Sequence, residues 1–440
     1  MKLWKKTLVF GLCLPVLALS ACSSGSGAGG DKGDKTQPAV PKQISNEPVT
    51  LTIYYYGGDL TDEEFQTYFV KPVGQKYPHL TLKLVRNAPG TKLEDLVASG
   101  SAPDLIYSPK GYMEDFIGLN IVQDLDSYIR EQKVDLGRFE PVTIDSLKSY
   151  APKFNMVALP FSYNSSAMFY NKDIFDKFGV AYPVDKMTWD DVIELGKRVS
   201  RKDGDTFYKA MYPSQLTQFA SQMAVAYTDP KTTLPALESD DWKKAATYFK
   251  RIYDLPENRV TKLNNFFVER DVAMYAGVTT YTFGQVKELM SKGTPLNWDL
   301  VSYPNFAETK GQSMALDSLV LIMTSTSKHK DQVFRVMDVV TSNDSQLALS
   351  KVGRMPALKD PKLKDAFGSD NPALKGKNVK ALFLNTPPIQ NMGPYDLEVA
   401  RLLNTLQPKL INGEEDVNTF LRNASEQAKL KIAEKKAASR

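Results

Sequence analysis

The sequence predicts an α/β protein, because strand-like and helix-like segments alternate along most of its 440 residues. The first unit shows the pattern: we expect a strand rich in β-branched and aromatic residues over 49–56, a helix over 62–77 and a second strand over 79–85. Repeated units of this kind predict a largely parallel sheet covered by helices. The roughly 390 residues after position 48 are too many for one compact core, so we expect two to three domains, or two lobes that share the chain.

Later segments continue the alternation. We expect a helix over 92–98, a strand beginning at 104–107, a strand over 272–277 followed by a helix over 279–289, and a buried strand over 315–324. Thr188 is placed to cap a helix, with Asp191 at the capping-box position, and another helix starts at Asp240. Apolar residues recur at helical spacing in both helices, so we expect their tryptophans, Trp189 and Trp242, in the core.

The N-terminus carries an export signal. Three lysines precede an apolar stretch at 8–19 that is too short to span a bilayer. Small residues at Ser20 and Ala21 permit cleavage before Cys22, and this pattern resembles the lipobox of bacterial lipoproteins. The resemblance implies a signal peptide over 1–21 and a diacylglycerol group on Cys22; an ordinary secretory signal with an incidental cysteine is the alternative.

Removal of the signal changes the charge and the cysteine content. Three of the 55 basic residues leave with it, so the mature chain has 52 basic against 51 acidic residues, a net charge of +1. This balance gives no reason to expect nucleic-acid binding. Cys13 leaves as well, so the mature chain can form no internal disulfide. We expect residues 22–48, rich in Gly, Ser, Pro and charge, to form a flexible linker, and no later segment is a transmembrane candidate.

Several short motifs, in order along the chain, carry a family resemblance. They lie at 98–105 (ASGSAPDL), 159–161 (LPF), 168–175 (MFYNKDIF), 188–191 (TWDD), 327–331 (SKHKD), 353–357 (GRMPA) and 413–417 (GEEDV). Together they resemble the extracellular solute-binding proteins, family 1, of ABC importers, in the branch that takes carbohydrates. The resemblance implies a two-lobed periplasmic-binding-protein type 2 fold, similar in architecture to maltose-binding protein, with a ligand cleft between the lobes.

The same resemblance implies how the chain is divided. We expect a first lobe of residues 49–158 and 311–353 and a second lobe of residues 159–305 and 356–440. The chain then crosses between lobes more than once, and we expect a hinge in the crossover segments near 158–161 and 303–314.

Strand ends supply the first candidate ligand-binding residues, because ligands of open α/β sheets bind outside the carboxyl ends of the strands. The candidates at these ends are Gly57, Gly58, Asp59, Tyr107, Ser108, Tyr163 and Asn164. Aromatic rings beside small polar groups suit a sugar, whose C–H faces stack on rings while its hydroxyls need hydrogen-bond partners. Core packing is the alternative for each tyrosine, since alternate strand residues point to opposite faces.

Four further candidates come from later segments. Tyr275 and Tyr281 belong to a strand and helix start that resemble the family's "AM…G" segment, where backbone N–H groups at the helix start are open to a ligand oxygen. Asp317 is polar within an apolar strand and needs a partner, either a ligand or the hinge backbone. Arg354 lies in a loop near the last crossover, where it either clamps a ligand or forms a salt bridge.

Enzyme motifs are absent from the sequence. It has two histidines, His79 and His329, with no cysteine or second histidine at metal-ligand spacing. It has no G-x-S-x-G nucleophile elbow, no phosphate-binding P-loop and no dinucleotide fingerprint between a strand and a helix. We therefore expect no catalytic residues, no metal and no cofactor, with a glycosidase that uses two distant carboxylates as the alternative.

These observations predict a lipid-anchored receptor that captures a solute outside the cell and delivers it to ABC permease subunits. The ligand we expect is a sugar or oligosaccharide, because the candidate residues are mostly aromatic and neutral. A peptide, a polyamine or a sugar phosphate is the alternative, as is a surface lipoprotein without transport. We expect a monomer on the outer face of the cell membrane, or on the periplasmic side where the organism has two membranes.

Overall fold

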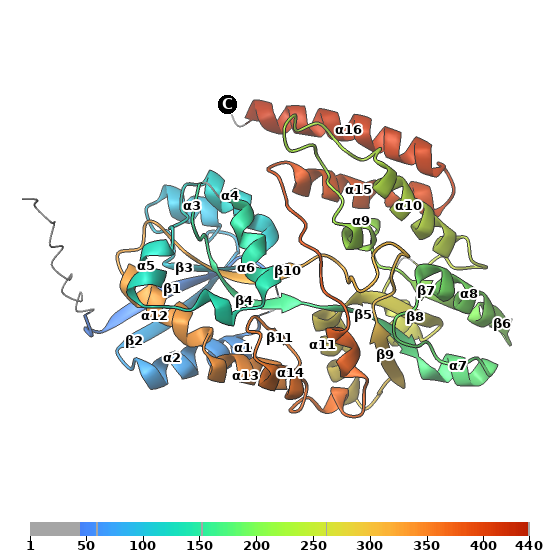
Figure 1. Ribbon diagram of the computed structural model, residues 1–440, viewed down its shortest axis with the longest axis horizontal. Coiled ribbons are helices and arrows are strands. Elements are labelled where there is room, and N and C mark those ends of the chain that lie inside the picture. The colour runs from blue at the N-terminus through green and yellow to red at the C-terminus, as the bar shows by residue number, and fades with distance from the viewer. Residues whose placement is uncertain (1–44, 59, 151–152, 261, 439–440) are drawn as a thin grey trace, which may run out of the picture. The chain divides into compact units, whose positions relative to one another are not determined.

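The computed structural model describes residues 45–58, 60–150, 153–260 and 262–438 (Figure 1). Within these ranges the strands form two sheets: a six-stranded sheet in the order β11-β4-β10-β3-β1-β2 and a five-stranded sheet in the order β6-β7-β8-β5-β9. The strands are β1 Val49–Tyr55, β2 Leu80–Arg86, β3 Leu105–Pro109, β4 Leu159–Asn164, β5 Ser166–Asn171, β6 Arg201–Asp203, β7 Thr206–Tyr212, β8 Val272–Val278, β9 Trp298–Ser302, β10 Asp317–Met323 and β11 Met355–Pro356. We call each sheet, with the helices packed on it, the first and the second lobe.

Strand direction is mixed in both sheets, so the expectation of a largely parallel sheet is wrong. The early βα units are parallel as predicted: β1 pairs in parallel with β2, from Val49 opposite Leu80 to Tyr55 opposite Arg86, and with β3. However, β10 is antiparallel to both β3 and β4, and β5 is antiparallel to both β8 and β9. The cause is topological, because a strand that enters a sheet from the other lobe has no local crossover helix to set its direction.

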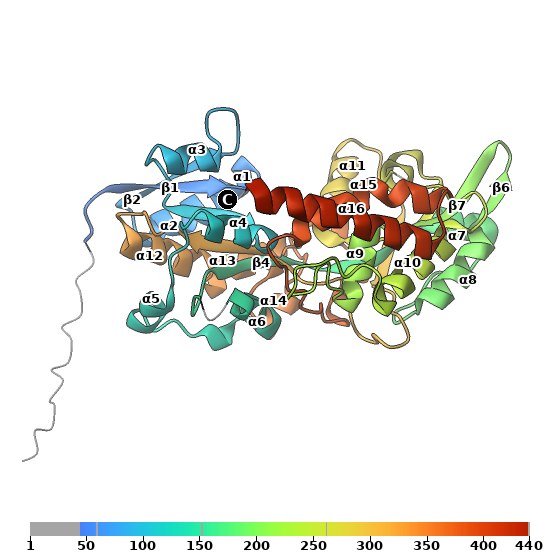
Figure 2. The same ribbon diagram turned by 90° about the horizontal axis from the view of Figure 1, so that it is seen from above.

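Helices cover both sheets. Their bounds are α1 Asp62–Phe65, α2 Lys71–Lys76, α3 Leu93–Ala98, α4 Met113–Gly118, α5 Asp126–Glu131, α6 Pro141–Leu147, α7 Lys172–Phe178, α8 Trp189–Val199, α9 Leu216–Ala220, α10 Asp240–Tyr253, α11 Thr279–Ser291, α12 Lys330–Val340, α13 Asn343–Lys351, α14 Pro361–Asp365, α15 Asp396–Ile411 and α16 Val417–Ala438. In the first lobe, α3 and α4 lie on one side of the sheet and α1, α2 and α13 on the other (Figure 1). In the second lobe, α15 and α16 run side by side in both views (Figure 2).

Sequence signals for helix ends are confirmed. Thr188 caps α8 and forms the expected capping box with Asp191. The helix expected over 62–77 starts with a second capping box, between Thr61 and Glu64. It is continuous in space, but a π-helical stretch at Gln66–Val70 separates α1 from α2. This stretch widens the helix by one residue and thereby changes which side chains face the sheet.

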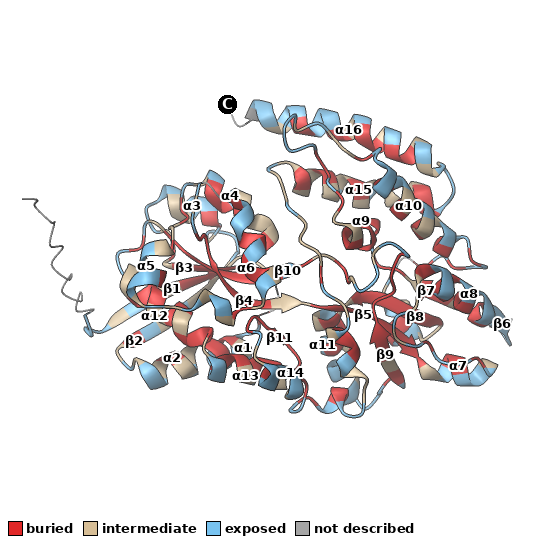
Figure 3. Cartoon of the chain, in the orientation of Figure 1, coloured by how far each residue is buried: buried red, intermediate tan, exposed pale blue. Residues whose placement is uncertain are grey.

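The described residues form three hydrophobic clusters: one in the first lobe, one in the second, and a third that lies mostly in the second lobe but includes Met355 of β11. The central strands of both sheets are largely buried, the edge strands β2 and β6 are more exposed, and the outer faces of the helices are exposed (Figure 3). Trp189 and Trp242 are both 0% exposed, which confirms that they belong to the core. Each indole N–H also has an acceptor: Trp189 donates to Gln222 Oε1 at 3.0 Å and Trp242 to the Ala226 carbonyl at 2.8 Å.

The chain passes between the sheets at three places. It leaves the six-stranded sheet through Ser165, between β4 and β5, returns along 303–316, between β9 and β10, and leaves again after β11. β4 and β11 pair within the six-stranded sheet, so this sheet extends past the boundaries at 158 and 353 that we expected for the first lobe. The division of the remaining residues between the lobes stays a prediction.

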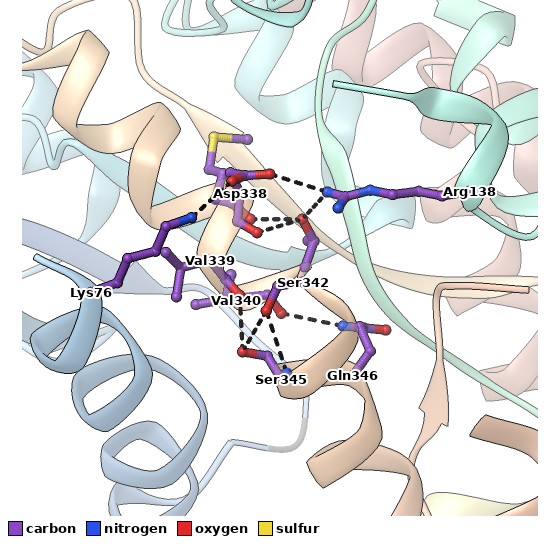
Figure 4. Close-up of polar contacts among 10 residues, drawn as sticks. Lys76, Arg138, Asp338, Val339, Val340, Ser342, Ser345 and Gln346 are labelled. Carbon is purple, nitrogen blue, oxygen red and sulfur yellow. Dashed lines mark hydrogen bonds and ion pairs between the residues drawn. The ribbon is translucent and has the colours of Figure 1, made fainter. Parts of the chain in front are cut away.

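Polar side chains fasten α12 and α13 to their neighbours. Asp338 forms ion pairs with Lys76 at 3.5 Å and with Arg138 at 3.4 Å (Figure 4). Gln346 is fully buried and its Nε2 donates to the carbonyl of Phe161 in β4 at 2.9 Å, while its Oε1 accepts from the Ala357 N–H at 2.7 Å. One amide therefore joins α13 to β4 and to the segment after β11.

Candidate functional site

A cavity of about 310 Å³ lies where the crossover segments meet. Its walls come from the first lobe at Lys110 and Gly111, from the crossovers at 164–166 and 314–317, and from the second lobe. The second-lobe residues are Thr217, Gln218, Ser221, Tyr227, Val278, Gln390, Met392 and Leu397. A concave site that joins apolar walls to a few polar groups is the usual form of a small-molecule site.

A polar chain crosses the floor of this cavity. Asp317 Oδ2 at the start of β10 accepts a hydrogen bond from Asn164 Nδ2 at the end of β4, at 3.1 Å. Asn164 Oδ1 in turn accepts from the hydroxyl of Thr280 in the first turn of α11. The strand ladder produces the first contact, because Asn164 and Asp317 are directly paired residues of β4 and β10. Through Thr280 the chain joins the first sheet to the second lobe.

Lys110 forms the first-lobe wall. The ladder between β3 and β10 ends at Pro109 opposite Leu319, so Lys110 follows β3 beside the start of β10, where Asp317 lies. Lys110 is only 4% exposed. Loss of hydration on burial lowers the pKa of its ammonium group, and the negative charge of Asp317 opposes this change.

The second-lobe wall combines fixed polar groups with an apolar surface. The Ser221 hydroxyl accepts from the Ala315 N–H at 3.1 Å and donates to the Gln218 carbonyl at 2.7 Å. Gln390 Nε2 donates to the Val225 carbonyl at 2.7 Å. Tyr227 is buried, and desolvation raises the pKa of its phenol. With Tyr227 and the side chains of Met314, Met392 and Leu397, the cavity offers apolar contact beside hydrogen-bonding groups, which suits a polyhydroxylated ligand.

The structure brings two of the predicted site residues together in the cavity, Asn164 and Asp317. Asp317 accepts a hydrogen bond from the side chain of Asn164 there. Tyr107, Ser108 and Tyr275 are buried in the strands and do not line the cavity.

The other predicted residues lie away from the cavity. Tyr163 packs against the hydrophobic cluster around β8, and Tyr281 is 43% exposed on α11. Gly57 and Gly58 turn the chain after β1, and Gly58 has φ of 95°, with Leu319 Cδ2 only 2.6 Å from where a Cβ would stand. Asp59 and Cys22 lie outside the described residues, as do the signal peptide and residues 22–44 of the linker.

Arg354 forms a salt bridge, which was one of its two expected roles. Its Nε and Nη2 donate to Glu64 Oε1 at 3.0 and 2.9 Å, and Glu64 Oε2 accepts the Thr61 N–H at 2.8 Å as part of the cap of α1. The pair connects the segment before β11 to the start of α1, within the first lobe. Arg354 is 8% exposed and does not line the cavity.

Tyr275 has a packing role in the second lobe. Its ring stacks on Phe169 and on Tyr212, with centroids 5.6 and 5.9 Å apart. It lies over Gly277, two residues further along the same face of β8. The first N–H of α11, that of Thr279, donates to the Ser165 carbonyl at 2.9 Å, so this group is used within the fold.

Sequence reasoning missed Lys110, Gln218, Tyr227 and Gln390. Lys110 had a usable signal, because it lies two residues beyond the predicted Ser108 at the same strand end. Gln218 lies in the short helix α9 and the other two second-lobe residues lie in irregular segments, and no local pattern indicates that they line the cavity.

The part of the chain that the structure describes contains no group of three or more His, Cys, Asp or Glu side chains placed to hold a metal ion. None of its helices is both long and apolar enough to cross a bilayer.

A family model of bacterial extracellular solute-binding proteins matches residues 58–347, well over half of the chain. The protein therefore belongs to the bacterial extracellular solute-binding protein family, which confirms the resemblance seen in the sequence motifs. A putative binding protein of Brucella abortus is 23% identical over 271 residues, which cover 58% of this chain and 62% of that protein. The chain thus spans about 62% of the length of the curated relatives it matches.

Solved structures share the two-lobed fold. A sugar transporter protein of Rhizobium etli, in an open conformation, matches with a TM-score of 0.71 at 19% identity, over 87% of this chain and 99% of that chain. The sugar-binding protein MalE of Xanthomonas citri matches with a TM-score of 0.70 at 16% identity, over 89% and 99%. A Listeria monocytogenes ABC substrate-binding protein in complex with cycloalternan matches with a TM-score of 0.68 at 17% identity, over 88% and 100%.

Proposed function

We propose that this protein is the lipid-anchored receptor of an ABC importer, and that it captures a sugar or oligosaccharide outside the cell and passes it to the permease. The observation that carries the proposal is the cavity at the crossovers, where Asn164, Asp317 and Ser221 stand beside an apolar wall. Such a surface matches the two faces of a sugar, its C–H groups and its hydroxyls.

Two further observations support this function. The structural relatives include proteins described as a sugar transporter, as sugar-binding and as bound to cycloalternan. The sequence around Cys22 fits lipidation, which would hold the receptor at the membrane where the permease works. The role requires no catalysis and no cofactor, and a monomer is sufficient for it.

A thermal-shift screen tests the ligand class. The protein for this screen is the mature chain with Cys22→Ser, which cannot be lipidated. A ligand at about 100 times its Kd adds about 2.7 kcal/mol to folding, which raises the Tm of a body of this size by about 3 °C. We expect a shift with one family of saccharides and none with peptides or polyamines. A shift with a control solute alone contradicts the sugar assignment, and no shift with any solute contradicts the receptor role.

Lipidation is tested separately in cells. We expect metabolic labelling with a radioactive fatty acid to mark the wild-type protein and not Cys22→Ser, and the variant to be released from the membrane fraction. Equal labelling of the wild-type protein and the variant would show that the fatty acid is attached to a residue other than Cys22.

A further inference from the structure

Lys110 is a buried cation that the fold does not use. Its side chain lines the cavity and is 4% exposed. Within the described ranges, no carboxylate forms an ion pair with its ammonium group, and no oxygen accepts a hydrogen bond from it. A largely buried ammonium group without an ion-pair partner costs several kcal/mol, so proteins rarely keep one without a use.

The fold also shows why none of the described residues accepts a hydrogen bond from Lys110. Asp317, whose negative charge acts on Lys110, accepts a hydrogen bond from Asn164, and Asn164 accepts one from Thr280. Burial lowers the pKa of Lys110, and the negative charge of Asp317 opposes this change. However, β10 lies between β3 and β4, and Oδ2 of Asp317 accepts its hydrogen bond from β4, whereas Lys110 follows β3. Lys110 lines the cavity, where an oxygen of a ligand can accept a hydrogen bond from its ammonium group.

We propose that Lys110 binds a carboxylate of the ligand, so that the sugar is an acidic one, a saccharide that contains uronic acid. This inference rests on the proposed function and names its substrate class. A carboxylate carries one negative charge, which a single lysine neutralises in a charge-assisted hydrogen bond. A phosphate carries about −1.5 to −2 at neutral pH, and Asp317 beside a single lysine would repel the excess charge.

The remaining groups fit the rest of such a ligand. Asp317 is an acceptor for hydroxyl groups, and Gln218 adds an amide to the opposite wall. Met392 and Leu397 face the cavity as well and would contact the C–H surface of the sugar ring. In a uronate, the carboxylate would contact the cation, a hydroxyl group would donate to the acceptor and the C–H face would contact the apolar surface.

The test is calorimetry on the mature Cys22→Ser chain with matched ligand pairs. Each pair is an oligouronide (galacturonate, glucuronate, mannuronate or guluronate) and its carboxyl-reduced, neutral counterpart. We expect one acid to bind roughly 10- to 100-fold more tightly than its neutral counterpart, as a charge-assisted hydrogen bond predicts. In Lys110→Met the advantage of the acid should disappear, and in Lys110→Arg part of it should return.

The control is Lys83→Met on β2, which removes the same charge from an exposed position and should keep the preference. Circular dichroism and the Tm of each variant show whether it folds; we expect Lys110→Met to fold, because methionine has a similar length and no charge to desolvate. Neutral sugars that bind as tightly as acids, with the same affinities in Lys110→Met, overturn this inference and leave the sugar receptor intact. Binding of no saccharide overturns both.

Discussion

The ion pair of Arg354 and Glu64 shows how a single buried charge fixes a helix start. Glu64 accepts from Arg354 through one oxygen and from the Thr61 N–H through the other. We expect Arg354→Met to lower the free energy of unfolding by about 2–3 kcal/mol, less than the roughly 3–5 kcal/mol for fully buried pairs, because Glu64 is 25% exposed and regains some water.

Urea denaturation of the single variants and of the double variant with Glu64→Gln measures this effect. The double variant should be less destabilised than the sum of the two single variants, since the partners are coupled. Ligand affinity should stay unchanged, because neither residue lines the cavity. A loss of affinity without a loss of stability would show that Arg354 binds ligand.

Gly277 is required by the ring that lies over it. A Cβ at this position would stand 2.2 Å from Tyr275 Cζ, so Gly277→Ala must push the ring out of its stack with Phe169 and Tyr212. We expect a loss of about 1–3 kcal/mol in the free energy of unfolding, typical of overpacking. Gly284→Ala is the control, because no atom lies within 4 Å of its Cβ position in α11, apart from its chain neighbours and the backbone of the helix itself. It should stabilise the protein by about 0.5–1 kcal/mol; similar results for both variants would contradict the packing argument.

Residue positions along a strand explain which site residues could be predicted. Asn164 and Asp317 were found because a polar residue at a strand end, or within an apolar strand, needs a partner. Tyr107 and Tyr275 could not be assigned to the core or to the ligand site from sequence. Side chains alternate between the two faces of a sheet, and the sequence does not indicate which face is turned to the other lobe. Lys110 was missed, although it follows the predicted Ser108 by two residues at the same strand end.

At the scale of elements, Gln346 is the residue through which α13 holds two strands. It joins the Phe161 carbonyl in β4 to the Ala357 N–H after β11. Gln346→Leu would fill the space but leave both backbone groups without this partner, at about 1–3 kcal/mol for each that stays unsatisfied. We expect the free energy of unfolding to fall by about 2–4 kcal/mol in urea titrations, on the basis of that range. Gln66→Leu, at an exposed position, should change it by less than about 0.5 kcal/mol.

Elements were predictable where their signals are local. The capping boxes at Thr61 and Thr188 and the core tryptophans of α8 and α10 follow from residues within one or two helical turns. Strand direction was not predictable in this way, since β10 joins β3 and β4 from more than 100 residues away in the chain. Local periodicity carries no information about such pairing.

At the scale of the whole molecule, buried tyrosines set an alkaline limit to stability. Burial, with a smaller contribution from Glu64, raises the pKa of Tyr68 to about 12, and burial, with Asp299, raises that of Tyr170 to about 12. Tyr68 belongs to the core of the first lobe and Tyr170 to that of the second. A folded pKa above the usual 10.0 means that stability is complete below pH 10.0 and is lost as the pH rises towards 12.

The urea midpoint should therefore be lower at about pH 11 than at about pH 9. Tyr68→Phe combined with Tyr170→Phe should reduce this difference, because phenylalanine has no proton to lose. An equal fall in the double variant would assign the alkaline instability to other groups.

Ligand-driven closure is the last expectation, and it concerns the crossovers. The chain joins the lobes at Ser165, along 303–316 and after β11, and the cavity lies among these segments. Rotation about three backbone segments can bring the lobes together over a ligand while each core stays intact, as in other hinge motions. We therefore expect the radius of gyration from X-ray scattering to decrease when a saturating ligand is added.

Distance measurements can separate hinge motion from general compaction. The mature chain with Cys22→Ser has no cysteine left, so dyes attach only where cysteines are introduced. Lys83→Cys in the first sheet and Lys202→Cys in the second form one labelled pair, and Lys83→Cys with Lys71→Cys form a control pair within the first lobe. Energy transfer should rise with ligand in the first pair and stay constant in the control. Constant transfer in both pairs, with ligand shown to be bound, would mean that the receptor binds without closing, and the permease would then have to recognise the ligand or a local change at the cavity.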